Sequence, residues 1–268
     1  MSETQSSPVG DLLRSWRQAR HMSQLDLALQ AQVSTRHLSF IETGRSRPSR
    51  EMVLRLSEVL DVPLRDRNTV LEAAGYARLY RETGLAEPQM DQVRRAVQFI
   101  LDNFEPNAAV VLDHCWNIVL ANSASAKLMA YLLGPAAGSV GPNLVRLLFD
   151  PQGLRPYVSN WHEVARVMVD RIHRESATGL EGDETRELLE DLLAYPGVPE
   201  RWASPDLEQP LDLLIPIRFR KDEMELNFFT TITTLGTPQD VTLQELRIEC
   251  LFPMDEASEK NLRSVVLS

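Results

Sequence analysis

The stretch Ser23-Gln24-Leu25-Asp26-Leu27-Ala28, followed at once by Val33-Ser34-Thr35-Arg36-His37-Leu38, decides the fold of the N-terminal part of this chain. Ser23 and Asp26 have the spacing of a capping box, in which two residues satisfy each other's backbone at a helix start. Ser34 can cap a second helix over Thr35–Thr43. Gly44 follows that helix, where a left-handed residue is favoured. The stretch therefore predicts two short helices joined by a tight turn.

Three more helices are predicted around this pair. Leu12, Leu13, Trp16 and Ala19 recur at helical spacing and indicate a helix before it. Pro48-Ser49 starts a helix over Arg50–Leu60, and Pro63 opens another that Gly75 closes. Five short, closely capped helices within the first 78 residues predict a compact all-α bundle.

Residues 12–60 resemble the helix-turn-helix of the phage-repressor (Cro/C1, or XRE) family. Besides the stretch above, the matching text is Leu12-Leu13-Arg14-Ser15-Trp16-Arg17 and Ile41-Glu42-Thr43-Gly44-Arg45. The resemblance implies a transcription regulator that binds double-stranded DNA, with the helix led by Ser34 in the major groove. It also implies that Arg17 and Glu42 form a structural ion pair.

Within that picture, particular side chains are expected to touch DNA. Arg36 can make a two-pronged contact to guanine. Phe40 suits a thymine methyl group, with a contact to a partner helix as the alternative. Hydroxyl, amide and guanidinium groups at the helix starts suit phosphates. The predicted DNA-binding residues are Gln24, Ser34, Thr35, Arg36, Ser39, Phe40, Arg45 and Arg47.

The charge distribution is compatible with DNA binding although the net charge is −10. The first 78 residues hold 11 arginines and 9 acidic residues, whereas the remainder holds 17 basic and 29 acidic residues. A head with clustered arginine on an acidic body lets a regulator be acidic overall. One such module makes too few base contacts for a unique site, so we expect a homodimer.

The rest of the chain changes its periodicity. A helix is expected over Gln89–Phe104, then short strands over Ala108–Asp113 and Asn117–Ala121 with a turn at His114–Trp116. Helices follow, and three strands close the chain at Leu211–Arg220, Glu225–Leu235 and Leu246–Leu251. This order predicts an α+β domain with helices on one face of a five-stranded antiparallel sheet. The expected organisation is a disordered leader over 1–9, a helix-turn-helix domain over 10–78, a linker with the start of a helix over 79–95, and a ligand-binding and dimerisation domain over 96–268.

From about Ala96 onward the chain resembles the ligand-binding domain of MmyB-like transcription regulators, which has a PAS-like fold. The matching text includes Pro106-Asn107-Ala108-Ala109-Val110-Val111-Leu112-Asp113, Val119-Leu120-Ala121-Asn122-Ser123-Ala124 and Asn143-Leu144-Val145-Arg146-Leu147-Leu148-Phe149. The resemblance implies a pocket between sheet and helices. The helices and strands offer it a mostly apolar lining, which suits a small apolar ligand such as a fatty acid. The candidate ligand-binding residues are Leu148, Phe149, Trp161, His162, Val164, Met168, Ile172, Phe228, Thr230, Ile232 and Cys250.

A second interpretation stays open for this domain. It could serve only as a dimerisation or protein-partner module. A partner module should expose an apolar patch of more than a few hundred Å². A sensor should instead enclose a cavity.

Other classes of function are disfavoured. None of the five histidines has zinc-ligand spacing, and His114-Cys115 has no recognisable third group beside it, so we expect no enzyme, no metal and no cofactor. No apolar run approaches the length of a membrane span, and the N-terminus lacks the pattern of a secretory signal. With only two cysteines, we expect a cytoplasmic protein.

Overall fold

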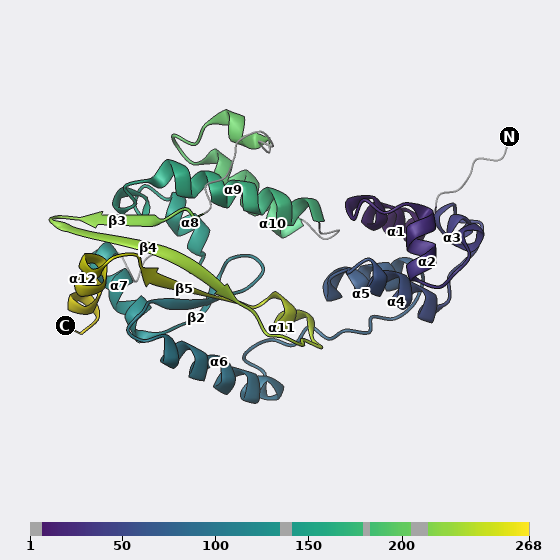
Figure 1. The fold of residues 1–268 in the computed structure, drawn as a ribbon, viewed down its shortest axis with the longest axis horizontal. Helices are drawn as coiled ribbons and strands as arrows, with labels where there is room; N and C mark the ends of the chain where they lie inside the picture. Colours follow the sequence, from purple (N-terminus) through teal and green to yellow (C-terminus); the bar gives the residue numbers. More distant parts are fainter. Residues whose placement is uncertain (1–6, 135–140, 179–182, 205–213, 268) are drawn as a thin grey trace. The chain divides into compact units, whose positions relative to one another are not determined.

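The computed structural model describes residues 7–134, 141–178, 183–204 and 214–267 (Figure 1). The chain divides into an N-terminal unit, Met1–Glu82 with Ala177–Gly182 and Thr237–Gln244, and a C-terminal unit of Thr83–Ser176, Asp183–Gly236 and Glu245–Ser268. The expected leader over 1–9 lies outside the described residues up to residue 6, and from Pro8 onward it is helical rather than disordered. None of the described helices has the length and apolar character that a membrane crossing requires.

The N-terminal unit begins with the five short helices that the sequence predicts. Serines cap three of the five, because each side-chain oxygen accepts a hydrogen bond from a backbone N–H one turn later. Ser23 accepts from Asp26 at 3.1 Å, Ser34 from His37 at 3.1 Å and Ser49 from Met52 at 3.2 Å. The helices are α1 (Pro8–Ala19), α2 (Gln24–Gln30), α3 (Thr35–Glu42), α4 (Arg50–Val59) and α5 (Leu64–Ala73).

Helix α3 is held against α1 and α2 by its inner face. Leu38 and Ile41 on that face are completely buried. Gly10 of α1 lies so close to the end of α3 that a Cβ there would be 2.5 Å from the carbonyl oxygen of Ile41. At the end of α3 the backbone reverses at Gly44, whose φ of +71° confirms the expected left-handed residue. The outer face of α3 is thereby left at the surface.

The C-terminal unit contains the five-stranded antiparallel sheet that the sequence predicts, with its strands in the order β2-β1-β5-β4-β3 (Figure 1). A tight turn at residues 113–117 joins the first two strands. A long connection with helices then leads to the last three. The strands are β1 (Ala109–Leu112), β2 (Ile118–Ala121), β3 (Ile217–Lys221), β4 (Met224–Thr233) and β5 (Arg247–Pro253).

Helices cover both faces of this sheet, which corrects the expectation of one covered face. On one face, Val110 and Leu112 of β1 join a core formed with helices. Those helices are α7 (Ser123–Leu133), α8 (Leu144–Phe149), α9 (Trp161–Thr178), α10 (Asp183–Ala194) and α12 (Glu256–Val266). On the other face lies α6 (Asp91–Phe104), whose Phe104 ring meets Phe252 of β5 edge-on at 5.9 Å.

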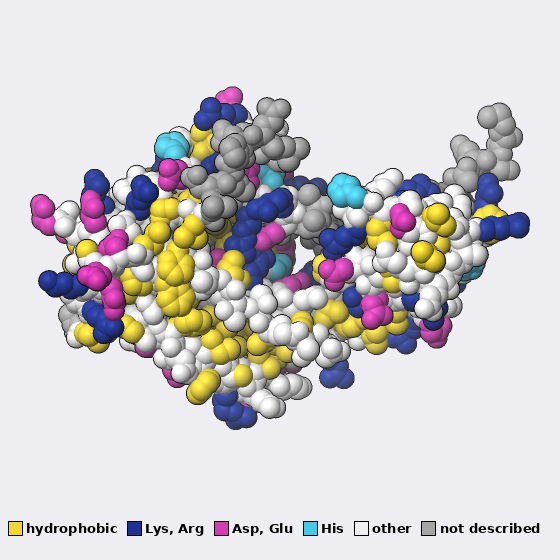
Figure 2. Space-filling model, viewed as in Figure 1, with side chains coloured by type: hydrophobic (Ala, Val, Ile, Leu, Met, Phe, Trp, Pro, Cys, Tyr) yellow, Lys and Arg dark blue, Asp and Glu magenta, His cyan; other side chains and the backbone are white. Residues whose placement is uncertain are grey.

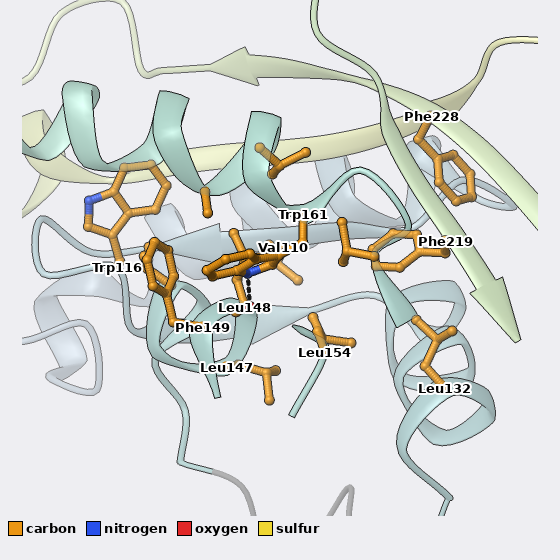
Figure 3. Close-up of a cluster of buried hydrophobic side chains, with 14 of the residues drawn as sticks. Val110, Trp116, Leu132, Leu147, Leu148, Phe149, Leu154, Trp161, Phe219 and Phe228 are labelled. Atoms are coloured by element: carbon orange, nitrogen blue, oxygen red, sulfur yellow. Dashed lines mark hydrogen bonds between the residues drawn. The ribbon is translucent and has the colours of Figure 1, made fainter. Parts of the chain in front are cut away.

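The main core is built around aromatic side chains of α8, α9 and the sheet (Figure 3). Phe149 and Trp161 pack edge to face with centroids 5.5 Å apart. The indole N–H of Trp161 donates to the backbone oxygen of Leu148 at 2.9 Å (Figure 3). This bond satisfies the one polar atom of a buried indole and so fixes its orientation.

Parts of the sequence prediction lie outside the described residues or differ from the structure. Most of the expected loop over Gly134–Pro142 and the beginning of the expected strand over Leu211–Arg220 are not described. Two helices were not predicted, α11 (Val241–Glu245) and α12. The capping of α12 is nevertheless local, since Asp255 accepts a hydrogen bond from the N–H of Ser258 at 2.7 Å.

Candidate functional site

The outer face of α3 carries a small aromatic and cationic cluster. The guanidinium of Arg36 lies 5.3 Å from the ring centroid of Phe40, and that of Arg45 lies 6.0 Å from it. Arg36 and Arg45 are exposed, whereas Phe40 is half-buried. The ring thus supports two positive charges side by side at the surface, an arrangement suited to an anionic groove.

The predicted hydroxyl contacts lie on the same helix. Ser34 is the exposed N-cap of α3, and its Oγ is occupied by the His37 N–H. Thr35 and Ser39 are half-buried. The start of α3 therefore presents backbone N–H groups and the side chains of 35, 36 and 39 together.

A buried carboxylate fixes this helix from behind. Glu42, at the end of α3, is 1 % exposed and accepts from Arg17 Nε at 2.7 Å and Arg17 Nη2 at 2.9 Å. Gln24 Nε2 donates to the same carboxylate at 2.8 Å, and Arg14 lies 3.6 Å away. Burial alone would raise the pKa of Glu42, but these donors and charges lower it below its ordinary value.

Two predicted phosphate contacts are committed to internal bonds. Arg47 donates from Nε at 3.1 Å and from Nη2 at 2.8 Å to the backbone oxygen of Ala74, at the end of α5. Its guanidinium also lies 5.5 Å from the Tyr76 ring. The Gln24 amide nitrogen is bound to Glu42. These side chains hold helices together in the structure, a role that the sequence pattern alone did not indicate.

The C-terminal unit contains an apolar cavity of about 90 Å³ between the sheet and its helices, partly open to solvent. Its wall is formed by side chains from β1, α7, α8, α9 and the last three strands. The polar side chains on the wall are Ser125, Thr230 and Glu249. A mostly apolar wall with a few polar groups is typical of sites for small amphiphilic molecules.

The candidate ligand-binding residues divide between the cavity and other places. Leu148, Val164, Met168 and Thr230 line the cavity. Phe149, Ile172 and Phe228 are completely buried elsewhere in the core, where they pack against other core side chains. Trp161 packs against Phe149 and Trp202, His162 is exposed beside Trp202, and Ile232 is 44 % exposed near the end of β4.

Cys250 lies on the opposite face of the sheet from the cavity. It pairs with Ala109, while its neighbour Glu249 pairs with Val110 on the cavity wall. The prediction that Cys250 faces the cavity was therefore wrong. Alternate residues of a strand point to opposite faces, and in β5 it is the neighbouring Glu249 that faces the cavity. Burial raises the pKa of the Cys250 thiol to about 12, so it stays protonated at neutral pH.

A charged group beside the cavity was not predicted. Glu249 lies 3.5 Å from Arg171, and Arg171 and Arg247 both bond Glu175, at 3.1 and 2.8 Å. Trp116 is also on the cavity wall, and its ring centroid lies 4.4 Å from the Arg171 guanidinium and 5.0 Å from that of Arg247. Its indole N–H donates to Glu175 at 3.2 Å. Burial raises the pKa of Glu249, and the two arginines offset part of that rise.

Comparison with known families assigns both units. The family model described as the MmyB-like transcription regulator ligand binding domain matches residues 93–265. The chain belongs to the MmyB-like transcription regulators. A helix-turn-helix family model matches residues 13–66, which include α2 and α3. This MmyB-like regulator is thus a DNA-binding protein with a C-terminal ligand-binding domain.

More distant comparisons add little to this assignment. Among solved structures the chain is similar to one titled "Structure of an RNA-binding Light-Oxygen-Voltage Receptor", at 14% identity and a TM-score of 0.29. The alignment covers 97% of this chain and 63% of that receptor. So low a TM-score does not establish a common fold. No curated protein matches the chain.

Replacing Glu42 by Gln tests the buried cluster. The lowered pKa of Glu42 means that its carboxylate adds stability above its ordinary pKa, and that this stability is lost as the pH falls through the lowered value. Glu42→Gln should destabilise the N-terminal unit by about 3 kcal/mol at neutral pH, near the lower end for breaking a buried pair. It should also flatten the acid side of the stability profile. Urea denaturation across a pH series, followed by circular dichroism, measures both effects.

The matched control is Glu58→Gln, on the exposed side of α4. That substitution should change the stability by no more than about 0.5 kcal/mol. Equal stabilities and equal pH profiles for the two variants would contradict the role given to Glu42.

Proposed function

We propose that this MmyB-like regulator reads duplex DNA with the outer face of α3 and alters its DNA affinity when a small apolar ligand fills the cavity. The observation that carries the proposal is the apolar cavity in the C-terminal unit, whose wall includes three polar side chains. A ligand shifts a regulator only through its different affinities for two states. The cavity provides a place where such a difference can arise.

The proposed DNA-reading surface centres on Arg36, Phe40 and Arg45. Arg36 is exposed and its guanidinium packs against the Phe40 ring. This contact reduces the conformational entropy that the Arg36 side chain loses when it binds a base edge. Ser34, Thr35 and Ser39 lie beside it for phosphate or base contacts. We assign Gln24 and Arg47 to supporting α3 and α5, with at most secondary contacts to phosphate.

A fatty acid or similar amphiphile is the ligand class that we propose. The apolar wall suits an alkyl chain, and Ser125, Thr230 and Glu249 offer a polar end. The cavity is smaller than the roughly 150 Å³ site that holds benzene in an engineered protein, so a long chain requires the wall to move. Met129 and Met168 on the wall have flexible side chains that make such movement easy.

The same unit offers a surface for a second copy. Hydrophobic side chains gather over the sheet on the face seen in Figure 2. On the sheet face that α6 shares, the half-buried rings of Phe229 and Phe252 stack at 5.5 Å. We propose a homodimer that uses this face, because two modules are needed to bind paired half-sites. Light scattering should give twice the chain mass, and a monomer at micromolar concentration would exclude this arrangement.

The alternative remains a C-terminal domain that only dimerises or binds a protein partner. The apolar sheet face is compatible with it, whereas the apolar cavity between the sheet and its helices favours a sensor. We further propose that the protein works in the cytoplasm and catalyses no reaction. The family assignment to transcription regulators supports both statements.

Arg36→Ala tests the DNA-reading surface. The loss of one base contact should cost about 1–3 kcal/mol and relax the preference at one base position. Selection from a random duplex library, at fixed salt concentration, measures the change. Arg47→Ala is the control, since its guanidinium bonds Ala74 and its loss should lower stability but leave the selected sequence unchanged. An unaltered preference in Arg36→Ala would refute the assignment.

Thermal unfolding with decanoate tests the cavity. At one hundred times its Kd, a ligand should stabilise the protein by about 2.7 kcal/mol, a rise of roughly 5–10 °C in Tm. Val164→Phe fills the cavity and should abolish this rise, at a cost of about 1–3 kcal/mol in its own stability. Ile232→Phe, outside the cavity, should retain it. The absence of any rise in the wild type with decanoate or decanol would exclude the proposed ligand class.

A further inference from the structure

Three different ligating side chains converge at the β1–β2 turn of the C-terminal unit. The Nε2 atom of His114 lies 3.0 Å from an oxygen of Glu184, and the Cys115 Sγ lies 3.1 Å from the same oxygen. All three ligating atoms lie within 4.8 Å of one another. His114 and Cys115 come from the turn, whereas Glu184 comes from the first turn of α10.

The turn that carries two of these groups is firmly held. Asp113 accepts hydrogen bonds from the N–H groups of Cys115 and Asn117, each at 2.9 Å. Asn143 donates to the carbonyl oxygen of Cys115 at 2.6 Å. The backbone at Cys115 is therefore fixed on both sides, so that the thiol and the imidazole need little ordering to bind a common partner.

The imidazole of His114 is flanked by carboxylates at both nitrogens. Nδ1 lies 3.3 Å from an oxygen of Glu245, and Nε2 faces Glu184. A metal ion on Nε2 would leave the Nδ1 atom facing Glu245. Histidines that bind metals commonly donate their other N–H to a carboxylate, and Glu245 is placed for that role.

We propose that His114, Cys115 and Glu184 form a binding site for a zinc ion. Thiolate and imidazole together select zinc over magnesium or calcium, which prefer oxygen ligands. Zinc bonds of about 2.0–2.3 Å at tetrahedral angles place ligand atoms roughly 3.3–3.7 Å apart. The spacing at this turn approaches that value, and small rotations of the half-exposed His114 and the exposed Glu184 complete it.

Three protein ligands leave a fourth position for water or for another small molecule. Thiolate and carboxylate neutralise the two charges of the ion, and Glu245 orients the imidazole as a positioning residue. The ion would connect the turn to a residue 69 positions later in the chain. Zinc should therefore stabilise the C-terminal unit. Trp116, the residue after Cys115, lines the cavity, so the proposed ion lies next to the ligand-binding wall.

Zinc titration of the tag-free full chain by calorimetry, in a buffer that does not bind zinc, tests the site. We expect one ion per chain. Replacing the direct ligands, in Cys115→Ser or His114→Gln, should weaken binding by at least about 10–100-fold, the range found when outer-shell partners are lost. Glu245→Gln should weaken it by roughly 10-fold. Cys250→Ala changes a cysteine on the sheet face away from the cavity, and this variant should bind zinc as the wild type does.

Cobalt provides a second readout, and its spectrum in the wild type already reports whether a thiolate binds the metal. Cobalt bound to the wild type should show the absorption of a thiolate-to-metal charge transfer, and this band should disappear in Cys115→Ser and persist in Cys250→Ala. A cobalt spectrum without thiolate character would overturn the proposal, as would zinc affinity that is equal in the wild type and Cys115→Ser. The absence of zinc binding to the folded wild type would overturn the proposal as well.

Discussion

The position of α3 depends on the hydrogen bonds that the buried carboxylate of Glu42 accepts from two other helices. A buried charge is costly unless donors replace its lost water, and here the donors come from Arg17 on α1 and Gln24 on α2. The bonds can form only when the three helices meet at one orientation. Because Leu38 and Ile41 point inward from the same helix, Arg36 and Phe40 must then face outward. The shape of the DNA-reading surface thus follows from a charge on its hidden side.

A comparable arrangement inside the C-terminal unit explains why the cavity differs from the sequence prediction. In β5 the apolar Ile248 and Cys250 alternate with the charged Arg247 and Glu249. Hydrophobic periodicity alone would assign Ile248 and Cys250 to the sheet face that lines the cavity. The structure does the reverse, because α6 covers the other face and Arg171 with Glu175 neutralises the charges on the cavity side. Charged residues can face an interior when their partners come from elsewhere in the chain.

Local signals explain what could be predicted from sequence. Serine caps, the left-handed Gly44 and the β1–β2 turn depend only on neighbouring residues. The five N-terminal helices, the strands of the sheet and the order of these elements along the chain could therefore be predicted. The role of Arg47 depends on a carbonyl 27 positions away, and the contact of Glu184 with Cys115 spans 69 positions. No periodicity contains such information. The resemblance to known regulators, rather than spacing, singled out Arg17 with Glu42.

The small volume of the cavity bears directly on how such a domain can act as a switch. A pocket already shaped for its ligand would fill without changing its surroundings, and the bound and empty states would be nearly the same. A cavity of about 90 Å³ must widen for an alkyl chain, so the ligand binds a different arrangement of the wall. Differential affinity for two arrangements is what linkage requires of an effector. On our proposal, the flexible Met129 and Met168 make the wider state accessible, while Trp116, which contacts two guanidiniums and bonds Glu175, resists it. The balance between these side chains would then set how much of the ligand's binding free energy is available to the rest of the protein.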